Sequence, residues 1–132
     1  MKAFVDASVL VAIIANESDA EQLGFEVAAA SDPIWSAMSC WEAISGLHRS
    51  HGFAFERAQA EVEAFAKSRP FRLVEIGERE RSKALESYRR YGRGSGHAAK
   101  LNMGDCFAYA CTKTNDAVLL YKGNDFSKTD LA

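Results

Sequence analysis

Four acidic residues, spread widely along the chain, could act together if the fold gathers them: Asp6, Glu42, Asp105 and Asp125. Two carboxylates 4 Å apart repel by about 4 kcal/mol at an effective dielectric near 20. A cluster of four therefore stays ionised at neutral pH only if it binds a cation, and otherwise takes up protons. Oxygen ligands suit Mg²⁺, with Mn²⁺ as the alternative. A carboxylate-held Mg²⁺ activates water and neutralises phosphate charge, so the quartet predicts phosphoryl chemistry.

Each acid also has a local explanation. Asp6 could cap a helix that follows it, and Glu42 could complete a capping box with Ser39 in the run S-C-W-E. Asp105 could be a helix-start acid favoured by the helix dipole, and Asp125 a turn residue. Each explanation suffices for one residue, but none accounts for four acids meeting at one place.

The elements that must position these acids alternate along the chain. The pattern predicts strands at residues 3–5, 34–37, 71–76 and 117–121, and helices at 8–15, 18–30, 39–50, 54–69, 78–91 and 104–114. Such alternation indicates a parallel sheet with helices on both faces, whose sites lie at the carboxyl ends of the strands. Two acids follow strands, and two lie at helix starts on that same edge. We therefore expect all four on one rim.

The helical periodicity also predicts which side chains are buried. In residues 39–50 it places Trp41, Ile44 and Leu47 on one apolar face, and in residues 78–91 it predicts Leu85 and Tyr88 within the buried stripe. Stacking of Trp41 on a nucleic-acid base is the alternative for that side chain.

The charge distribution points to a polyanionic partner. The net charge is −2, but residues 67–100 hold ten basic and four acidic groups, whereas residues 1–66 hold three basic and ten acidic groups. A basic middle between acidic ends suggests that one surface contacts a polyanion.

The composition excludes several classes of protein. With 132 residues, 48 % of them hydrophobic and 26 % charged, the chain is expected to form one domain over residues 1–132. No apolar run reaches the roughly 18 residues of a membrane span, and Asp6 comes before any signal-like segment, so we expect a cytosolic protein without membrane contact. Three cysteines without a C-x-x-C pair indicate neither a disulfide framework nor a zinc knuckle.

Four segments together resemble the PIN-domain toxins of VapBC toxin–antitoxin pairs. They are Val5–Ser8 (VDAS), Ser39–Glu42 (SCWE), Leu101–Ala110 (LNMGDCFAYA) and Leu120–Phe126 (LYKGNDF), the last followed by Thr129 and Asp130. The resemblance runs over the whole chain. It implies a three-layer α/β/α sandwich with a central, mostly parallel sheet.

The resemblance also implies an activity: a Mg²⁺-dependent endoribonuclease that cleaves structured RNA, such as tRNA, by in-line attack of metal-activated water. The family's acidic quartet falls on Asp6, Glu42, Asp105 and Asp125, with Asp6 and Asp105 expected as direct metal ligands. Glu42 and Asp125 would complete the site, orient water or hold a second ion about 4 Å away.

Further residues acquire roles from the same resemblance. The small hydroxyl of Ser8 would bond a carboxylate or the scissile phosphate, and Asp130 is a fifth acid that ranks below the quartet. The basic stretch would grip the RNA backbone through Arg89, Arg90, Arg93 and Lys100. Such toxins typically form homodimers and are silenced by a cognate antitoxin protein.

One rival class remains open at this point. The same alternation fits a non-catalytic RNA-binding or regulatory α/β module. A receiver domain would need an acid at the end of the third strand, where Ile76-Gly77 stands, and a haloacid-type phosphatase would need a second Asp in place of Ser8. Metal-dependent cleavage of RNA separates the nuclease from the binding module.

Overall fold

The computed structural model describes all residues, 1–132, and contains one four-stranded parallel sheet in the order β3-β2-β1-β4. The strands are β1 (Lys2–Val5), β2 (Asp32–Trp35), β3 (Arg72–Leu73) and β4 (Val118–Leu120). The helices are α1 (Ala7–Ile14), α2 (Ala20–Ala29), α3 (Ala37–Ser50), α4 (Phe55–Ser68), α5 (Glu78–Tyr91) and α6 (Met103–Thr114).

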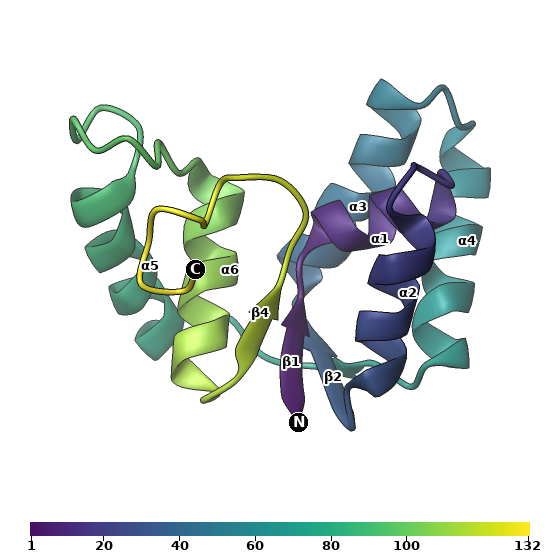
Figure 1. Ribbon diagram of the computed structural model, residues 1–132, viewed down its shortest axis with the longest axis horizontal. Coiled ribbons are helices and arrows are strands. Elements are labelled where there is room, and N and C mark those ends of the chain that lie inside the picture. Colours follow the sequence, from purple (N-terminus) through teal and green to yellow (C-terminus); the bar gives the residue numbers. More distant parts are fainter.

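Helices cover both faces of the sheet (Figure 1). Ala3 and Val5 of β1 point into a core shared with α1, α2, α3 and α4. Phe4, between them, points to the opposite face and packs with α5, α6 and the C-terminal segment. This alternation is the period of two that a strand imposes on its side chains. The expected three-layer α/β/α sandwich is therefore confirmed.

The edge strand β3 is shorter than the sequence predicted. It covers Arg72–Leu73 rather than residues 71–76, and Leu73 is 61 % exposed. One further backbone bond, from the Val74 N–H to the Trp35 carbonyl (2.8 Å), extends its contact with β2. The apolar run therefore predicted too long a strand, because only the first part of the run lies beside β2 and can pair with it.

No helix of the structure is both long enough and apolar enough to cross a membrane.

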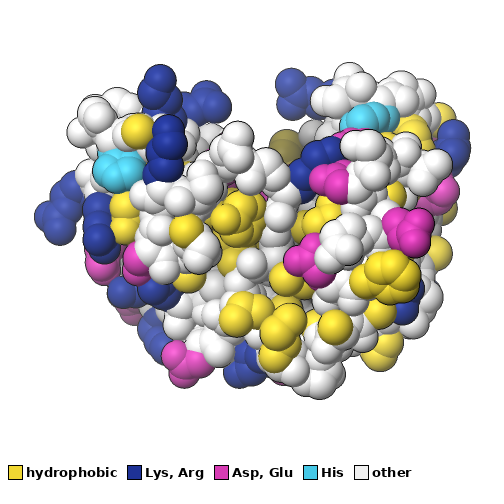
Figure 2. Space-filling model, in the orientation of Figure 1, with side chains coloured by type: hydrophobic (Ala, Val, Ile, Leu, Met, Phe, Trp, Pro, Cys, Tyr) yellow, Lys and Arg dark blue, Asp and Glu magenta, His cyan; other side chains and the backbone are white.

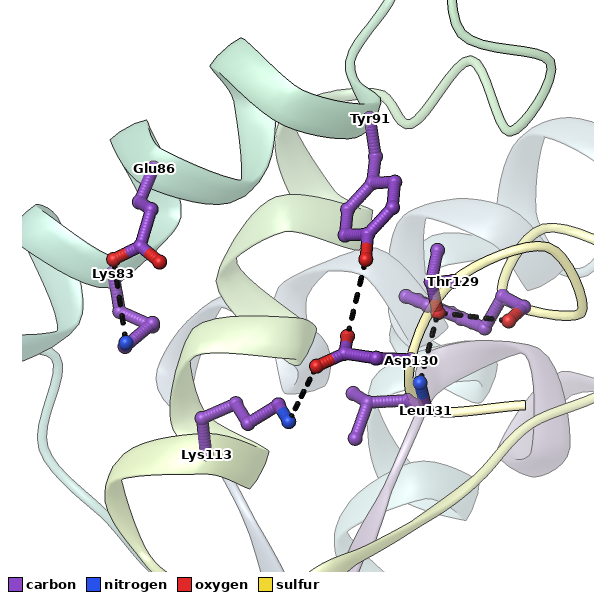
Figure 3. Close-up of polar contacts among 8 residues, drawn as sticks. Lys83, Glu86, Tyr91, Lys113, Thr129, Asp130 and Leu131 are labelled. Atoms are coloured by element: carbon purple, nitrogen blue, oxygen red, sulfur yellow. Dashed lines mark hydrogen bonds and ion pairs between the residues drawn. The ribbon is translucent and has the colours of Figure 1, made fainter.

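The C-terminal segment is fastened to α5 and α6 (Figure 3). The Asp130 carboxylate accepts hydrogen bonds from Lys113 Nζ (2.7 Å) and from the Tyr91 hydroxyl (3.4 Å). Phe126 is almost completely buried, and its carbonyl accepts a bond from the Thr129 hydroxyl (2.8 Å). These contacts hold the segment that follows β4, and Asp130 acts as its anchor.

Candidate active site

Asp6 is held rigidly at the carboxyl end of β1. It is buried and caps the N-terminus of α1, accepting bonds from the Ser8 N–H (3.1 Å) and the Ser8 hydroxyl (2.5 Å). The Ser8 oxygen in turn accepts a bond from the Lys122 N–H (3.0 Å), just beyond β4. Of the two roles expected for Ser8, the structure shows the bond to a carboxylate. The Asp6 side chain is thereby fixed between β1, α1 and the end of β4.

Glu42 does not form the capping box expected with Ser39. The N-cap of helix α3 is Ser36, three residues before Ser39; the Ser39 N–H bonds the Ser36 hydroxyl (3.2 Å) and the Ser36 N–H bonds the Ser39 hydroxyl (2.9 Å). Glu42 therefore lies in the second turn of the helix, where no backbone N–H needs its carboxylate. The local explanation for this residue is wrong.

The Glu42 carboxylate instead reaches across to the first turn of α6. A Cβ added to Gly104 would lie only 1.8 Å from Glu42 Oε2. The absence of a side chain at position 104 is what allows the carboxylate to occupy this place. Gly104 precedes Asp105, so the contact brings Glu42 beside the third acid of the quartet.

Asp105 combines a local and a shared role. It lies in the first turn of α6 and forms a reciprocal capping box with Asn102: the Asp105 N–H bonds Asn102 Oδ1 (2.8 Å), and the Asn102 N–H bonds Asp105 Oδ2 (3.1 Å). The helix-start explanation is thus correct, but it uses one carboxylate oxygen only. The other oxygen has no hydrogen-bond partner and is available to the cluster.

Asp125 completes the group from the turn after β4. Its side chain is exposed, and its negative charge raises the pKa of both Asp6 and Asp105. The end of β1, the second turn of α3, the first turn of α6 and the turn after β4 therefore place the four acids that the sequence singled out within electrostatic range of one another. In Figure 1 this edge of the sheet is where the arrowheads of β1 and β4 end.

The electrostatics of the four acids show that they act on one another. Burial, then the charges of Asp6 and Asp105, raise the pKa of Glu42 to about 7. Burial, Asp125 and Asp6 raise the pKa of Asp105 to about 6, although the Asn102 N–H and Arg93 act in the opposite direction. Burial is also the main reason why the pKa of Asp6 is raised. No member of the quartet forms an ion pair with a cationic side chain.

This donor set fits a hard divalent cation. All four candidate ligands are carboxylates, the preferred ligands of Mg²⁺ and Mn²⁺, and no ion pair with a side chain of the protein neutralises them. As the side chains lie, no three His, Cys, Asp or Glu residues form a complete metal site. Ionised carboxylates without a cation repel one another, which favours such a spread arrangement.

The four basic residues expected to bind RNA are not equally close to the acids. The charge of Arg93 lowers the pKa of Asp105, so this arginine lies within electrostatic range of the cluster. The Arg90 guanidinium lies over the Tyr91 ring, 4.7 Å from its centroid. Arg89 and Lys100 are exposed, and none of the four forms an ion pair. Figure 2 shows dark-blue side chains gathered at the loop end of the α5–α6 lobe, beside a notch in the outline of the molecule.

Two features of the site were not expected from the sequence. Gly104 provides the space for Glu42, and Trp41, placed on the buried face by periodicity, is 67 % exposed beside Glu42. Leu85 and Tyr88 are likewise 60 % and 49 % exposed rather than buried. The run N-M-G-D contained the signal for Gly104, because an Asn cap three residues before an acid marks a helix start that leaves Gly104 in the first turn.

Comparison with known proteins identifies the family. Residues 3–131 match the PIN domain. A VapC ribonuclease of Rhizobium meliloti is 37 % identical, covering 97 % of this chain and 98 % of its own length. The chain belongs to the VapC family of PIN-domain ribonucleases.

Solved structures of a VapC toxin and of a toxin–antitoxin complex share the fold. VapC20 of Mycobacterium tuberculosis, a toxin that cleaves the sarcin–ricin loop, superimposes with a TM-score of 0.73 at 19 % identity and covers 95 % of this chain and 92 % of its own. A toxin–antitoxin complex from Klebsiella pneumoniae gives a TM-score of 0.69 at 19 % identity, with 97 % and 92 % covered. At these identities the likeness concerns the fold.

Proposed function

We propose that this VapC-family chain, acting as one domain over residues 1–132, is a Mg²⁺-dependent endoribonuclease and the toxin of a toxin–antitoxin pair. The observation that carries the proposal is the acid quartet: carboxylates from β1, α3, α6 and the turn after β4 lie within electrostatic range of one another, the pKa values of Asp6, Glu42 and Asp105 are raised, and no member forms an ion pair. Mn²⁺ is the alternative ion.

In this proposal Asp6 and Asp105 are the direct ligands, and Glu42 and Asp125 complete the site. When bound, the cation polarises the phosphodiester and lowers the pKa of water. Asp6 is suited to a fixed position because two bonds from Ser8 hold it, and Asp105 because Asn102 holds one of its oxygens. Glu42, whose carboxylate forms no hydrogen bond in the structure, is suited to complete the site and to orient the attacking water.

The RNA backbone would be held by the basic residues of the segment 67–100. Arg93, whose charge acts on Asp105, would contact the phosphate next to the cut, whereas Arg89, Arg90 and Lys100 would extend the contact. Structured RNA such as tRNA is the proposed substrate class, and the cytoplasm, where such RNA is found, the proposed place of action.

The proposed partners are an antitoxin protein and a second copy of the chain. An arginine of the antitoxin can pair with two carboxylate oxygens of the quartet at once and so replace the cation. We therefore expect the product of a neighbouring gene to bind this chain and suppress cleavage. Undiminished cleavage and growth arrest on co-expression would contradict this.

The nuclease proposal is tested by incubating the purified protein with total cellular RNA. Cleavage is expected in Mg²⁺ and absent in EDTA, and the Asp105→Asn variant is expected to be inactive at matched protein and Mg²⁺ concentrations. A useful control is Asp116→Asn, because Asp116 lies in the turn after α6, away from the quartet. Full activity of Asp105→Asn would refute the metal-nuclease proposal and leave the non-catalytic binding module.

A further inference from the structure

A shallow depression on α3 adjoins the acid quartet. It has a volume of about 300 Å³ and is lined by Trp41, Glu42, Ser45, Gly46, Arg49 and Ser50. Glu42 belongs both to this depression and to the candidate active site, so the two are continuous. A group bound in the depression would therefore also lie next to the acid quartet.

The walls of the depression carry an aromatic ring and a positive charge. Trp41 is 67 % exposed, in contrast to Trp35, which is 8 % exposed. Trp41, Ser45 and Arg49 follow one another at intervals of four residues, so they form a stripe along one face of α3. An exposed indole is a platform on which a base can stack, and a guanidinium is a ligand for phosphate.

Arg49 is distinctive in the acidic half of the chain. Residues 1–66 contain three basic side chains, and the other two have partners: Lys2 Nζ donates to the Asn115 carbonyl (2.9 Å), and Arg57 pairs with Glu61 (2.9 Å). The Arg49 side chain is exposed and takes part in no hydrogen bond or ion pair of the structure. Its charge is therefore available to an anion beside Trp41.

The geometry points to this depression as the site for an unpaired nucleotide that adjoins the scissile phosphodiester, with the base stacked on Trp41 and its phosphate on Arg49. The inference rests on the proposed ribonuclease function and adds a substrate feature to it. Because the indole face must be covered by a base, the nucleotide at this position has to be single-stranded. Trp41 is thus a positioning residue, and stacking tolerates any of the four bases.

Kinetics on a single-stranded RNA oligonucleotide test the inference. Trp41→Leu is expected to raise KM about tenfold, in line with the strength of base–aromatic stacking, while kcat stays within about twofold. Trp41→Phe, which keeps an aromatic face, is expected to restore most of the affinity. Phe25→Leu is the matched control, because Phe25 is 64 % exposed on α2 and lines no part of the depression. An unchanged KM in Trp41→Leu would overturn the inference.

Fluorescence provides a readout that does not depend on cleavage. In a Trp35→Phe variant the only indole is Trp41, and a hexanucleotide RNA added in EDTA is expected to quench it; anisotropy of the labelled RNA measures the bound fraction independently. An abasic RNA of equal length should bind without quenching. Unquenched Trp41 at a bound fraction above one half, or no RNA binding at all, would overturn the inference.

The two proposals fail in different ways. A protein without nuclease activity whose Trp41 is quenched by RNA would refute the proposed function and leave the base site intact. Loss of self-association in Trp41→Leu with unchanged RNA affinity, measured by sedimentation, would assign the indole to an interface between two copies and overturn the base site. Arg49→Gln should weaken the binding of both the intact and the abasic RNA, because it removes a phosphate contact. Arg57→Gln is the control.

Discussion

Asp6 and Asp105 each combine two functions in one side chain. Both accept backbone N–H groups at a helix start, and both lie in a cluster of like charges. The first function stabilises the fold, whereas the second destabilises it when no cation is present. Replacing aspartate with asparagine separates the two functions, because an amide oxygen still accepts the N–H but carries no charge.

Asp6→Asn and Asp105→Asn are therefore expected to keep or raise the Tm of the metal-free chain. The like-charge repulsion disappears, while the bonds from Ser8 and Asn102 can still form. Each variant should also lose the rise in Tm that Mg²⁺ causes in the wild type. Thermal unfolding in EDTA and in Mg²⁺ measures both effects. If the acids were caps alone, the Tm would not respond to Mg²⁺ in any of the proteins.

The pH dependence of stability should reveal the raised pKa of Glu42. In the folded chain this pKa is about 7 and that of Asp105 about 6, both above their ordinary values of 4.5 and 3.8. The folded state therefore binds more protons than the unfolded state between about pH 4 and 7, and stability falls as the pH rises through that window. We expect the Tm in EDTA to decrease from pH 5 to pH 8.

The Glu42→Gln variant provides the comparison for this measurement. It removes a titrating group whose pKa is raised in the folded chain, so its decrease in Tm should be smaller than that of the wild type. Parallel curves for the two proteins would show that Glu42 has an ordinary pKa in the folded chain.

At the level of elements, the close approach of α3 to α6 decides where Glu42 lies. A Cβ at position 104 would meet the end of the flexible Glu42 side chain. Such a side chain can rotate away, so a larger residue at 104 should displace the carboxylate without disrupting either helix. The glycine is thus required by the site more than by the fold.

Gly104→Ala is accordingly expected to separate activity from stability. Alanine favours a helix interior over glycine by up to about 1 kcal/mol, so the Tm in EDTA should stay equal or rise. RNA cleavage and the Mg²⁺-induced rise in Tm should both fall, because Glu42 is moved. Gly24→Ala on α2, where an added Cβ meets nothing within 4 Å, is the control that should gain stability with full activity. A fully active Gly104→Ala would contradict the role given to Glu42.

At the level of the whole molecule, the two sides of the site differ in charge. The first 66 residues, which form α1 to α3 and most of α4, are acidic, whereas the segment of residues 67–100, which contains α5 and the loop after it, is basic. A polyanion is therefore attracted to the α5 side and, apart from Arg49, repelled by the other. We expect this asymmetry to orient a bound RNA across the acid cluster.

Combined replacement of Arg90 and Arg93 by alanine is expected to weaken RNA binding and to flatten its dependence on salt. For single-stranded RNA, every phosphate that the protein no longer neutralises lowers the slope of log affinity against log salt by roughly 0.7. The Mg²⁺ affinity, measured as the shift in Tm, should not decrease, since neither arginine is a ligand. An unchanged salt slope would show that these arginines do not touch the RNA backbone.

Much of the site followed from rules that act along the chain. Asp6 and Asp125 come after strands, and parallel strands end at one edge, so their meeting was predictable without coordinates. The sequence could not decide between Ser36 and Ser39 as the N-cap of α3, because both serines offer the same hydroxyl. Because the N-cap is Ser36 and not Ser39, Glu42 lies beyond the capping positions of α3 and its carboxylate is not used by the helix start.

Burial was predicted less well, for a physical reason. Periodicity shows which residues share a helix face, but not whether another element covers that face. Trp41, Leu85 and Tyr88 have the spacing of core residues and are nevertheless exposed. Similarly, the sequence suggested the fifth acid, Asp130, as a further site residue. In the structure its carboxylate accepts a hydrogen bond from Lys113, in the last turn of α6.

The order of strands and helices, the parallel sheet and the four acids at its carboxyl edge were thus contained in the sequence, because they depend on local periodicity and on the direction of parallel strands. The contact between Glu42 and Gly104 joins residues 62 positions apart, and the exposure of Trp41 beside Arg49 depends on what the rest of the chain leaves uncovered. Only the tertiary structure could decide these, because they arise where separate elements pack against one another rather than within any one of them.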